Sequence, residues 1–178
     1  MNRSTTSIST SLVRLVFATF LITAVGLGLA SEGRADQSEM DDAYVKYRQT
    51  VMEGIGNNMG AIGDILKNRL MLPGHVANHA QQLAESSELI AAAFKQKTQS
   101  TETDAKVEIW KDWTKFEAAI ADFAAAAKDL QAAASGSDAS AVGPAVKVLG
   151  KSCGGCHKSF RKPKEESFRK MKLDHDHQ

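Results

Sequence analysis

The stretch Cys153-Gly154-Gly155-Cys156-His157 constrains how the whole chain can fold. Cysteines three positions apart lie about one turn apart on a helix, so both side chains reach the same side of it. Two thiols at this spacing can bond to the two vinyl groups of one haem, and the histidine that follows can offer its imidazole to the iron. The sequence therefore predicts one covalently attached haem c and its iron, with Cys153 and Cys156 as thioether residues and His157 as iron ligand.

Other uses of a C-x-x-C pair fit this chain less well. A thioredoxin-like redox pair belongs near a strand-turn-helix unit early in an α/β domain, whereas this motif lies near the end of a chain without a strand pattern. A zinc site needs about four ligands, and no second cysteine pair accompanies the remaining histidines. These are His75, His79, His175 and His177. A haem-free helical adaptor, with the two cysteines joined in a disulfide, is a third alternative.

The N-terminal part of the chain is typical of an export signal. Arg3 and Arg14 flank a polar region, an apolar run follows at 15–30, and Gly33-Arg34-Ala35 supplies small residues for a signal peptidase. We expect a signal peptide over 1–35, cleavage near Ala35, and a periplasmic mature domain over 36–178 that no membrane segment anchors. The apolar run is short for a membrane span of about 20 residues, although an uncleaved anchor is the alternative.

Charge and composition exclude several classes of function. The chain has 22 basic and 21 acidic residues, and the predicted signal peptide holds three of the first and one of the second, which leaves 19 and 20. A nearly balanced charge gives no attraction to nucleic acid. The mature chain also lacks a positioned nucleophile, a carboxylate pair and a phosphate-binding loop, so we predict that it is not an enzyme.

Hydrophobic spacing predicts four helices, over 38–66, 75–95 and 104–134, with the last beginning between 138 and 143 and ending near Pro163. A charged tail follows from about 164. Apolar positions three and four apart in the last helix include both cysteines, which places the haem in the interior. The expected fold is an all-α antiparallel four-helix bundle. The stripe of the first helix is Val45, Met52, Ile55, Met59, Ile62 and Leu66.

The first helix also contains glycines that need a reason, because each costs roughly 1 kcal/mol relative to alanine inside a helix. Gly56, Gly60 and Gly63 share one side by their spacing. They allow either a flat macrocycle or a neighbouring helix to approach the backbone closely.

The chain resembles the class II cytochromes c, which comprise cytochrome c-prime and its low-spin relatives. A C-x-x-C-H motif on the last of four helices is typical of that family, and Val45-Lys46-Tyr47-Arg48-Gln49-Thr50-Val51-Met52 is similar to its first helix. Trp110 and the segment 116–123 resemble its third helix. The resemblance covers nearly the whole mature chain.

The resemblance implies roles for six residues. Cys153 and Cys156 would form the thioethers, His157 would be the proximal ligand, and Met52 would face the distal side. Arg48 would lie beside a haem propionate, although a solvated surface charge is the alternative. Arg161, four residues after His157, would lie near the proximal imidazole or else complement the C-terminus of its helix.

The sulfur of Met52 separates two functions. If it binds the iron, methionine and histidine together favour outer-sphere electron transfer with a redox partner protein. If it only packs against the haem, the centre is five-coordinate and open to a diatomic gas such as nitric oxide or carbon monoxide. We expect ligation, because a thioether is flexible and because 57–62 looks more like the low-spin relatives. Family members are single or form dimers, so a monomer and a homodimer are both compatible with the sequence.

Overall fold

The computed structural model describes the backbone of residues 11–168 and the side chains of 36–168. Two units divide between Met40 and Asp41, and the second contains the bundle. Among the described residues, no helix has the length and apolar content needed to cross a membrane. The helices are α1 (Ser11–Asn68), α2 (His75–Lys95), α3 (Glu108–Lys111), α4 (Trp113–Ser135) and α5 (Val142–Phe160), with short 3-10 turns η1 (Ala139–Ala141) and η2 (Lys164–Glu166).

Helix α1 begins at Ser11, well before the start near Ser38 that the periodicity predicts. The chain has no proline before Pro73, so nothing of that kind interrupts the helix between the apolar run and the bundle. Cleavage near Ala35 stays a prediction. Residues 1–10 and most of the predicted charged tail, with His175 and His177, lie outside the described residues.

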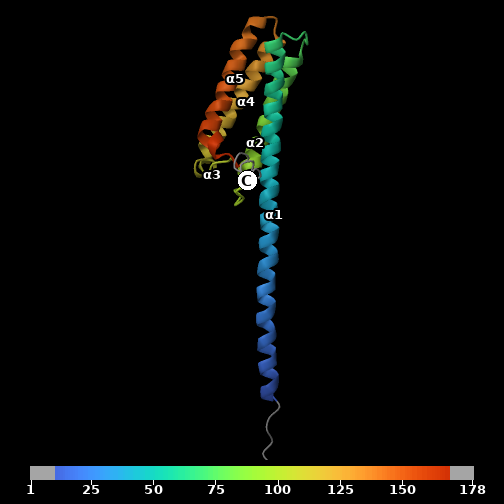
Figure 1. Ribbon diagram of the computed structural model, residues 1–178, viewed down its shortest axis with the longest axis vertical. Helices are drawn as coiled ribbons and strands as arrows, with labels where there is room; N and C mark the ends of the chain where they lie inside the picture. The colour runs from blue at the N-terminus through green and yellow to red at the C-terminus, as the bar shows by residue number, and fades with distance from the viewer. Residues whose placement is uncertain (1–10, 169–178) are drawn as a thin grey trace, which may run out of the picture. The chain divides into compact units, whose positions relative to one another are not determined.

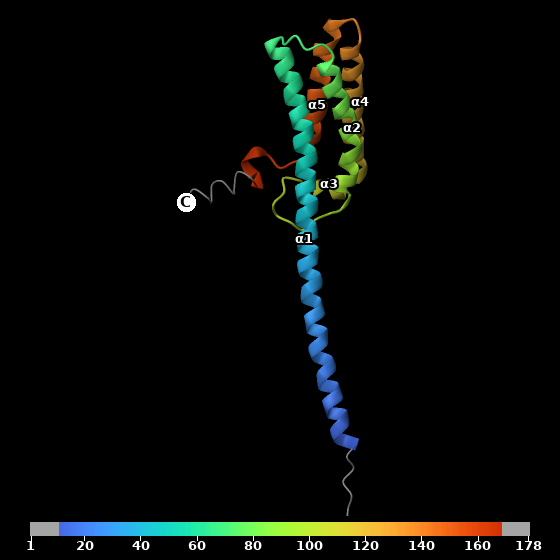
Figure 2. The same ribbon diagram turned by 90° about the vertical axis from the view of Figure 1, so that its right-hand side faces the viewer.

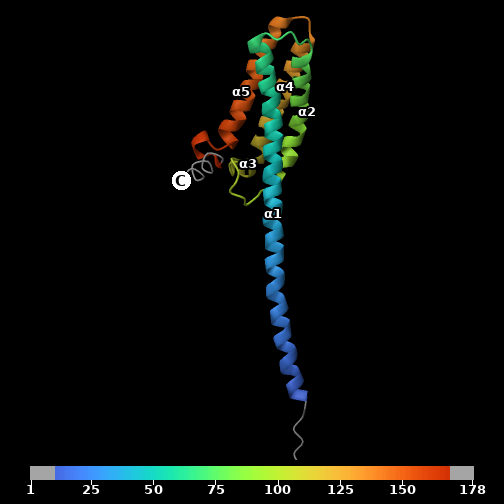
Figure 3. The same ribbon diagram turned by 45° about the vertical axis from the view of Figure 1, so that its right-hand side comes forward.

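In the second unit, α1 from Asp41 onward, α2, α4 and α5 run side by side with alternating directions (Figures 1, 2 and 3). Helix α2 packs against α4, and α4 packs against α5. Helix α1 contributes Val51, Ile55 and Ile62 to the same core. The predicted all-α four-helix bundle is confirmed, as are the bounds of α2 and the end of α5 before Pro163.

The predicted third helix over 104–134 is wrong in its first part. Residues 104–106 are not helical, and α3 and α4 are separate because Asp112 leaves the helical region at φ −133° and ψ 70°. The Asp112 carboxylate accepts a hydrogen bond from the backbone N–H of Lys115 at 3.1 Å. A carboxylate that caps a helix in this way satisfies a free N–H and favours a new helix start. The Thr103 hydroxyl, just before the predicted start of this helix, accepts from the backbone N–H of Ala105 in the non-helical segment.

Two further expectations for α1 need correction. Leu66 is 38% exposed, and Ile65 is buried in its place, so the buried stripe shifts by one position at the end of the helix. The glycines at 56, 60 and 63 do not mediate close helix packing, because a Cβ atom at each of them would meet no other atom within 4 Å. Of the three, only Gly56 lines the cavity described below.

Candidate haem site

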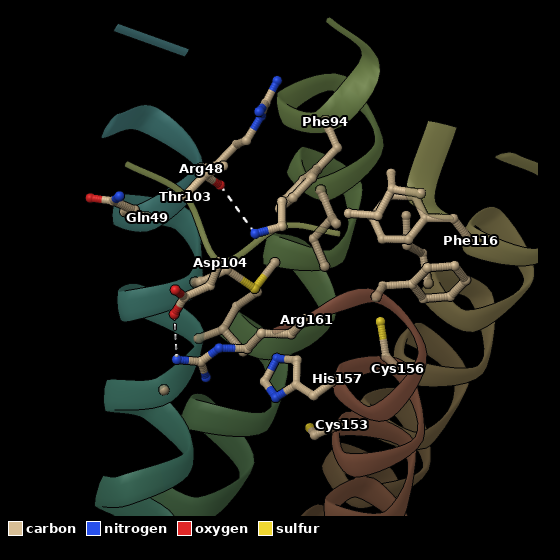
Figure 4. A pocket seen from close by; sticks show the side chains of 18 of the residues that line it. Arg48, Gln49, Phe94, Thr103, Asp104, Phe116, Cys153, Cys156, His157 and Arg161 are labelled. Carbon is tan, nitrogen blue, oxygen red and sulfur yellow. Dashed lines mark hydrogen bonds and ion pairs between the residues drawn. The ribbon is translucent and has the colours of Figure 1, made fainter. Parts of the chain in front are cut away.

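Helix α5 carries the three motif residues into one cavity of about 480 Å³, which is within the usual range for a small-molecule site. Pro144 lies in the first turn of α5, where its missing N–H costs no hydrogen bond. Cys153, Cys156 and His157 all line the cavity, and Figure 4 shows them projecting from successive turns of the same helix. Two thiols and an imidazole that open onto one cavity are the donors that covalent haem attachment requires.

Burial changes the pKa of each motif residue in the direction that favours its neutral form. The pKa of the Cys153 thiol is raised mainly by burial, and that of Cys156 is raised by burial and by the neighbouring Cys153. Burial against the cavity wall lowers the pKa of His157, and the positive charge of Arg161 lowers it further. The neutral imidazole, which has a free lone pair for a metal, is therefore favoured.

The wall opposite α5 comes from α1 and is mainly apolar. Met52 and Met59 are half-buried, pack against the core and line the cavity together with Ile55 and Gly56. The structure therefore brings Met52 and His157 to one cavity from different helices. An aromatic cluster also lines the cavity, in which the ring centroids of Phe94 and Phe116 lie 5.4 Å apart and those of Phe116 and Phe160 lie 5.2 Å apart.

Arg48 lines the cavity but is not a solvated surface charge, since only 3% of it is exposed. Its Nε donates to the carbonyl of Ala93 at 2.8 Å, and its other nitrogens donate to the Gln96 carbonyl and to the Thr98 hydroxyl. Its guanidinium also lies over the ring of Trp110, 5.2 Å from the centroid. Burial lowers its pKa, against an opposing effect from the negative charge of Asp41. Arg48 therefore caps the C-terminal end of α2.

Arg161 lies at the opposite rim, directly after α5. Its Nη2 atom forms an ion pair with Asp104 at 3.3 Å, and 53% of its side chain is exposed. Figure 4 shows this pair near the imidazole of His157, whereas the guanidinium of Arg48 is turned away from that ring. The backbone N–H of Arg161 donates to the His157 carbonyl, which ends the helix.

The other described histidines belong to different surroundings. His75 is the first residue of α2, and His79 contacts the Asn58 amide oxygen through Nδ1 at 2.8 Å. Within the described part of the chain, no group of three or more His, Cys, Asp or Glu side chains could hold a metal ion.

Sequence reasoning missed several cavity residues that lie outside the helical pattern. Thr103, Asp104 and Ala105 come from the segment before α3, and Phe168 comes from the segment after α5. No periodicity marks these positions. The only local signal is the acidic side chain of Asp104 next to Thr103, and this pair is equally typical of a helix start.

Comparisons with known proteins identify the family of this chain. The family model described as "Cytochrome C'" matches residues 43–161, which contain α1 from Ala43 onward, all later helices and the C-x-x-C-H motif. The chain belongs to the cytochrome c' family. A cytochrome c' from Rhodospirillum rubrum is 40% identical over 120 residues, covering 67% of this chain and 82% of the relative. One from Pararhodospirillum photometricum is 37% identical, covering 67% and 97%.

Solved structures of cytochromes c' also share the fold. Cytochrome c prime from Shewanella frigidimarina superposes with a TM-score of 0.64 at 28% identity, covering 69% of this chain and 97% of that one. A nitric oxide complex of a mutant cytochrome c prime from Alcaligenes xylosoxidans gives a TM-score of 0.63 at 29% identity, covering 70% and 97%. These relatives are cytochromes c', so they do not support the expected closeness to the low-spin members.

Family membership fixes the cofactor. Cytochromes c' are non-enzymatic proteins that carry one covalent haem c through a C-x-x-C-H motif, and this chain has that motif at 153–157. The residues present fit the group, because both thiols and the imidazole open onto a largely apolar cavity of suitable size. As a member of this family, the chain is an iron-containing haem protein of the electron-transport class.

Proposed function

We propose that this chain is a periplasmic five-coordinate cytochrome c' that binds nitric oxide or carbon monoxide. The haem, when bound, would supply an iron that can bind a small diatomic molecule. His157 would provide an imidazole ligand to that iron, and Cys153 and Cys156 would tether the macrocycle to α5. Two variants of one relative, cytochrome c prime from Alcaligenes xylosoxidans, were solved with nitric oxide bound, which supports a diatomic ligand.

The observation that carries the proposal is the apolar α1 wall. Its apolar part includes Met52, Ile55, Gly56 and Met59, which offer neither an imidazole nor an amine to a metal. The polar residues of α1 at the cavity are Arg48, Gln49 and Glu53. Met52 is half-buried and packs against the core cluster, so its side chain has neighbours that hold it without a metal bond. A wall of this kind excludes water and admits small uncharged molecules.

The competing function is electron transfer through iron bound by both Met52 and His157. Its support is the presence of the Met52 thioether in the same cavity as the imidazole. A redox partner protein would then be required, whereas gas binding requires none.

Absorption spectra of the oxidised and reduced protein separate the two functions. We expect high-spin spectra in both states and direct formation of a carbon monoxide complex by the reduced protein. Met52→Ala should leave the spin state unchanged and speed carbon monoxide association, because it removes bulk from the α1 wall. Met59→Ala, two turns along the same wall, is the matched control. A low-spin protein that becomes high-spin in Met52→Ala alone would establish methionine ligation instead.

The periplasmic location rests on the N-terminal pattern and on the typical location of the family. Expression in a bacterium that matures c-type cytochromes should release a coloured protein from the periplasm, with a mass that corresponds to residues 36–178 plus one haem. A coloured protein that retains residues 1–35 and stays with the membrane fraction would contradict the predicted signal peptide.

A further inference from the structure

The segment that follows α5 folds back over the edge of the haem cavity. Residues 162–168, called the strap below, lie beyond the family match, which ends at 161. Phe168 nevertheless lines the same cavity as His157. Ser167 is buried although it is polar, and it lies in the strap next to Phe168. The strap is therefore packed against the bundle, with its last described residue at the cavity.

Asp104 holds the strap in place. Its Oδ2 atom accepts from the Ser167 hydroxyl at 3.0 Å and from Arg161 at 3.3 Å, and its Oδ1 atom accepts from the backbone N–H of Phe168 at 3.0 Å. Its backbone carbonyl accepts from the N–H of Lys162 at 2.7 Å. A carboxylate with three donors from one segment forms charge-assisted hydrogen bonds, which are stronger than neutral ones.

The segment that carries Asp104 is itself fixed from several sides. The N–H of Lys106 donates to the carbonyl of Phe160 at 2.9 Å, so residues 104–106 and 160–162 pair as a short antiparallel bridge. On the other side, the Gln49 amide of α1 donates to the carbonyl of Glu102 at 3.0 Å. Residues 102–106 therefore connect the α1 wall of the cavity to the end of α5, and the strap closes against this connection.

We propose that Asp104 is a positioning residue that clamps the strap over the haem cavity, with Phe168 as an additional wall of the cofactor site. This proposal rests on the haem site described above, but not on the spin state or on the identity of the gas. The clamp shields one edge of the haem from water and from dissolved reactants. The aromatic ring supplies the cover, and the carboxylate fixes its place.

Hydrogen exchange of the holoprotein tests the clamp directly. In Asp104→Ala, the amide of Phe168 should exchange at least about tenfold faster, since its charge-assisted hydrogen bond to the carboxylate is lost. The amide of Lys162 is an internal reference, because its acceptor is the backbone carbonyl of residue 104, which alanine retains. Glu165→Ala is the matched control, because it removes an exposed carboxylate from the strap itself and should leave both amides protected. Unchanged protection of the Phe168 amide in Asp104→Ala would overturn the clamp.

Access to the haem tests the role of Phe168. The rate at which ascorbate reduces the oxidised holoprotein should rise severalfold in Asp104→Ala and in Phe168→Ala, and stay at the wild-type value in Glu165→Ala. Circular dichroism should show an intact bundle in every variant. If the strap loosens and the reduction rate does not change, Phe168 is not a wall of the site. A low-spin wild-type spectrum would refute five-coordination and leave these comparisons valid.

Discussion

The two helices that face each other across the haem cavity hold their functional side chains in different ways. On α5, the cysteines and His157 lie within five consecutive residues, so helical spacing alone brings them together. On α1, Arg48 is held by acceptors that lie 45 to 50 positions away in the chain. The α5 wall is thus fixed by local geometry, whereas the α1 wall depends on the packing of the bundle.

The two arginines at the cavity show the same contrast. Arg48 is almost fully buried and bonded to the end of α2, whereas Arg161 is largely exposed and has one ion pair. Burial of a charge without partners is very costly, so a buried arginine makes the surrounding structure depend on its hydrogen bonds. In the Arg161 pair, water solvates the arginine, which is 53% exposed, although only 13% of the Asp104 side chain is exposed, so the pair contributes less than a fully buried one.

Removal of both thiols should give the largest effect on the α5 side. In the double variant Cys153→Ser and Cys156→Ser, covalently bound haem should be absent, because no sulfur remains for a thioether. Haem staining of the denatured protein on a gel, together with its mass, measures this loss.

Ser152→Ala is the control for this variant, because it removes a hydroxyl that bonds to the Leu149 carbonyl and to the Cys153 side chain but leaves both sulfurs in place. It should retain all of the haem. Covalent haem in the double variant would show that local spacing on α5 does not form the attachment site.

Loss of the buried arginine should give the next largest effect. Arg48→Ala should lower the free energy of unfolding by about 3 kcal/mol or more, because it leaves buried carbonyls at the end of α2 without donors. Chemical denaturation of the holoprotein measures the change.

Arg161→Ala is the matched variant on the other wall, and its expected cost is about 1 kcal/mol, because the arginine is half-exposed and Asp104 keeps its hydrogen bonds from Ser167 and Phe168. Equal losses in the two variants would remove the contrast between the walls. Arg48→Lys should fall between them, since a lysine keeps the charge but not the planar set of donors.

Replacement of a glycine in α1 by alanine should give a small gain in stability, whereas the same change at a glycine with positive φ should give a loss. Gly60→Ala should raise the free energy of unfolding by about 0.5–1 kcal/mol, because a Cβ atom there meets nothing within 4 Å and alanine favours a helix. Gly74→Ala is the contrasting variant and should lose about 1–2 kcal/mol, since Gly74 has φ +78°. A loss of stability in Gly60→Ala would contradict the open space that the structure shows around this position.

Most of the helical architecture could be predicted from spacing. The bounds of α2 agree with the pattern, and the apolar stripe of α5 with both cysteines on its inner side predicted where the cavity lies. The pattern failed at Asp112, where a capping carboxylate starts a new helix within a continuous stripe, and at Leu66, where the end of α1 leaves the core. Periodicity records which residues are apolar, but it does not record where the backbone turns.

The amino-acid sequence by itself determined the covalent haem and its helix, because the five residues 153–157 are adjacent and the α-helix sets their directions. Only the tertiary structure decided that Arg48 caps α2, that Asp104 binds the strap, and that Phe168 reaches the cavity. These contacts join residues about 45 to 65 positions apart or lie outside any helix. Their geometry follows from how the helices pack and where the connecting segments cross, which no local pattern specifies.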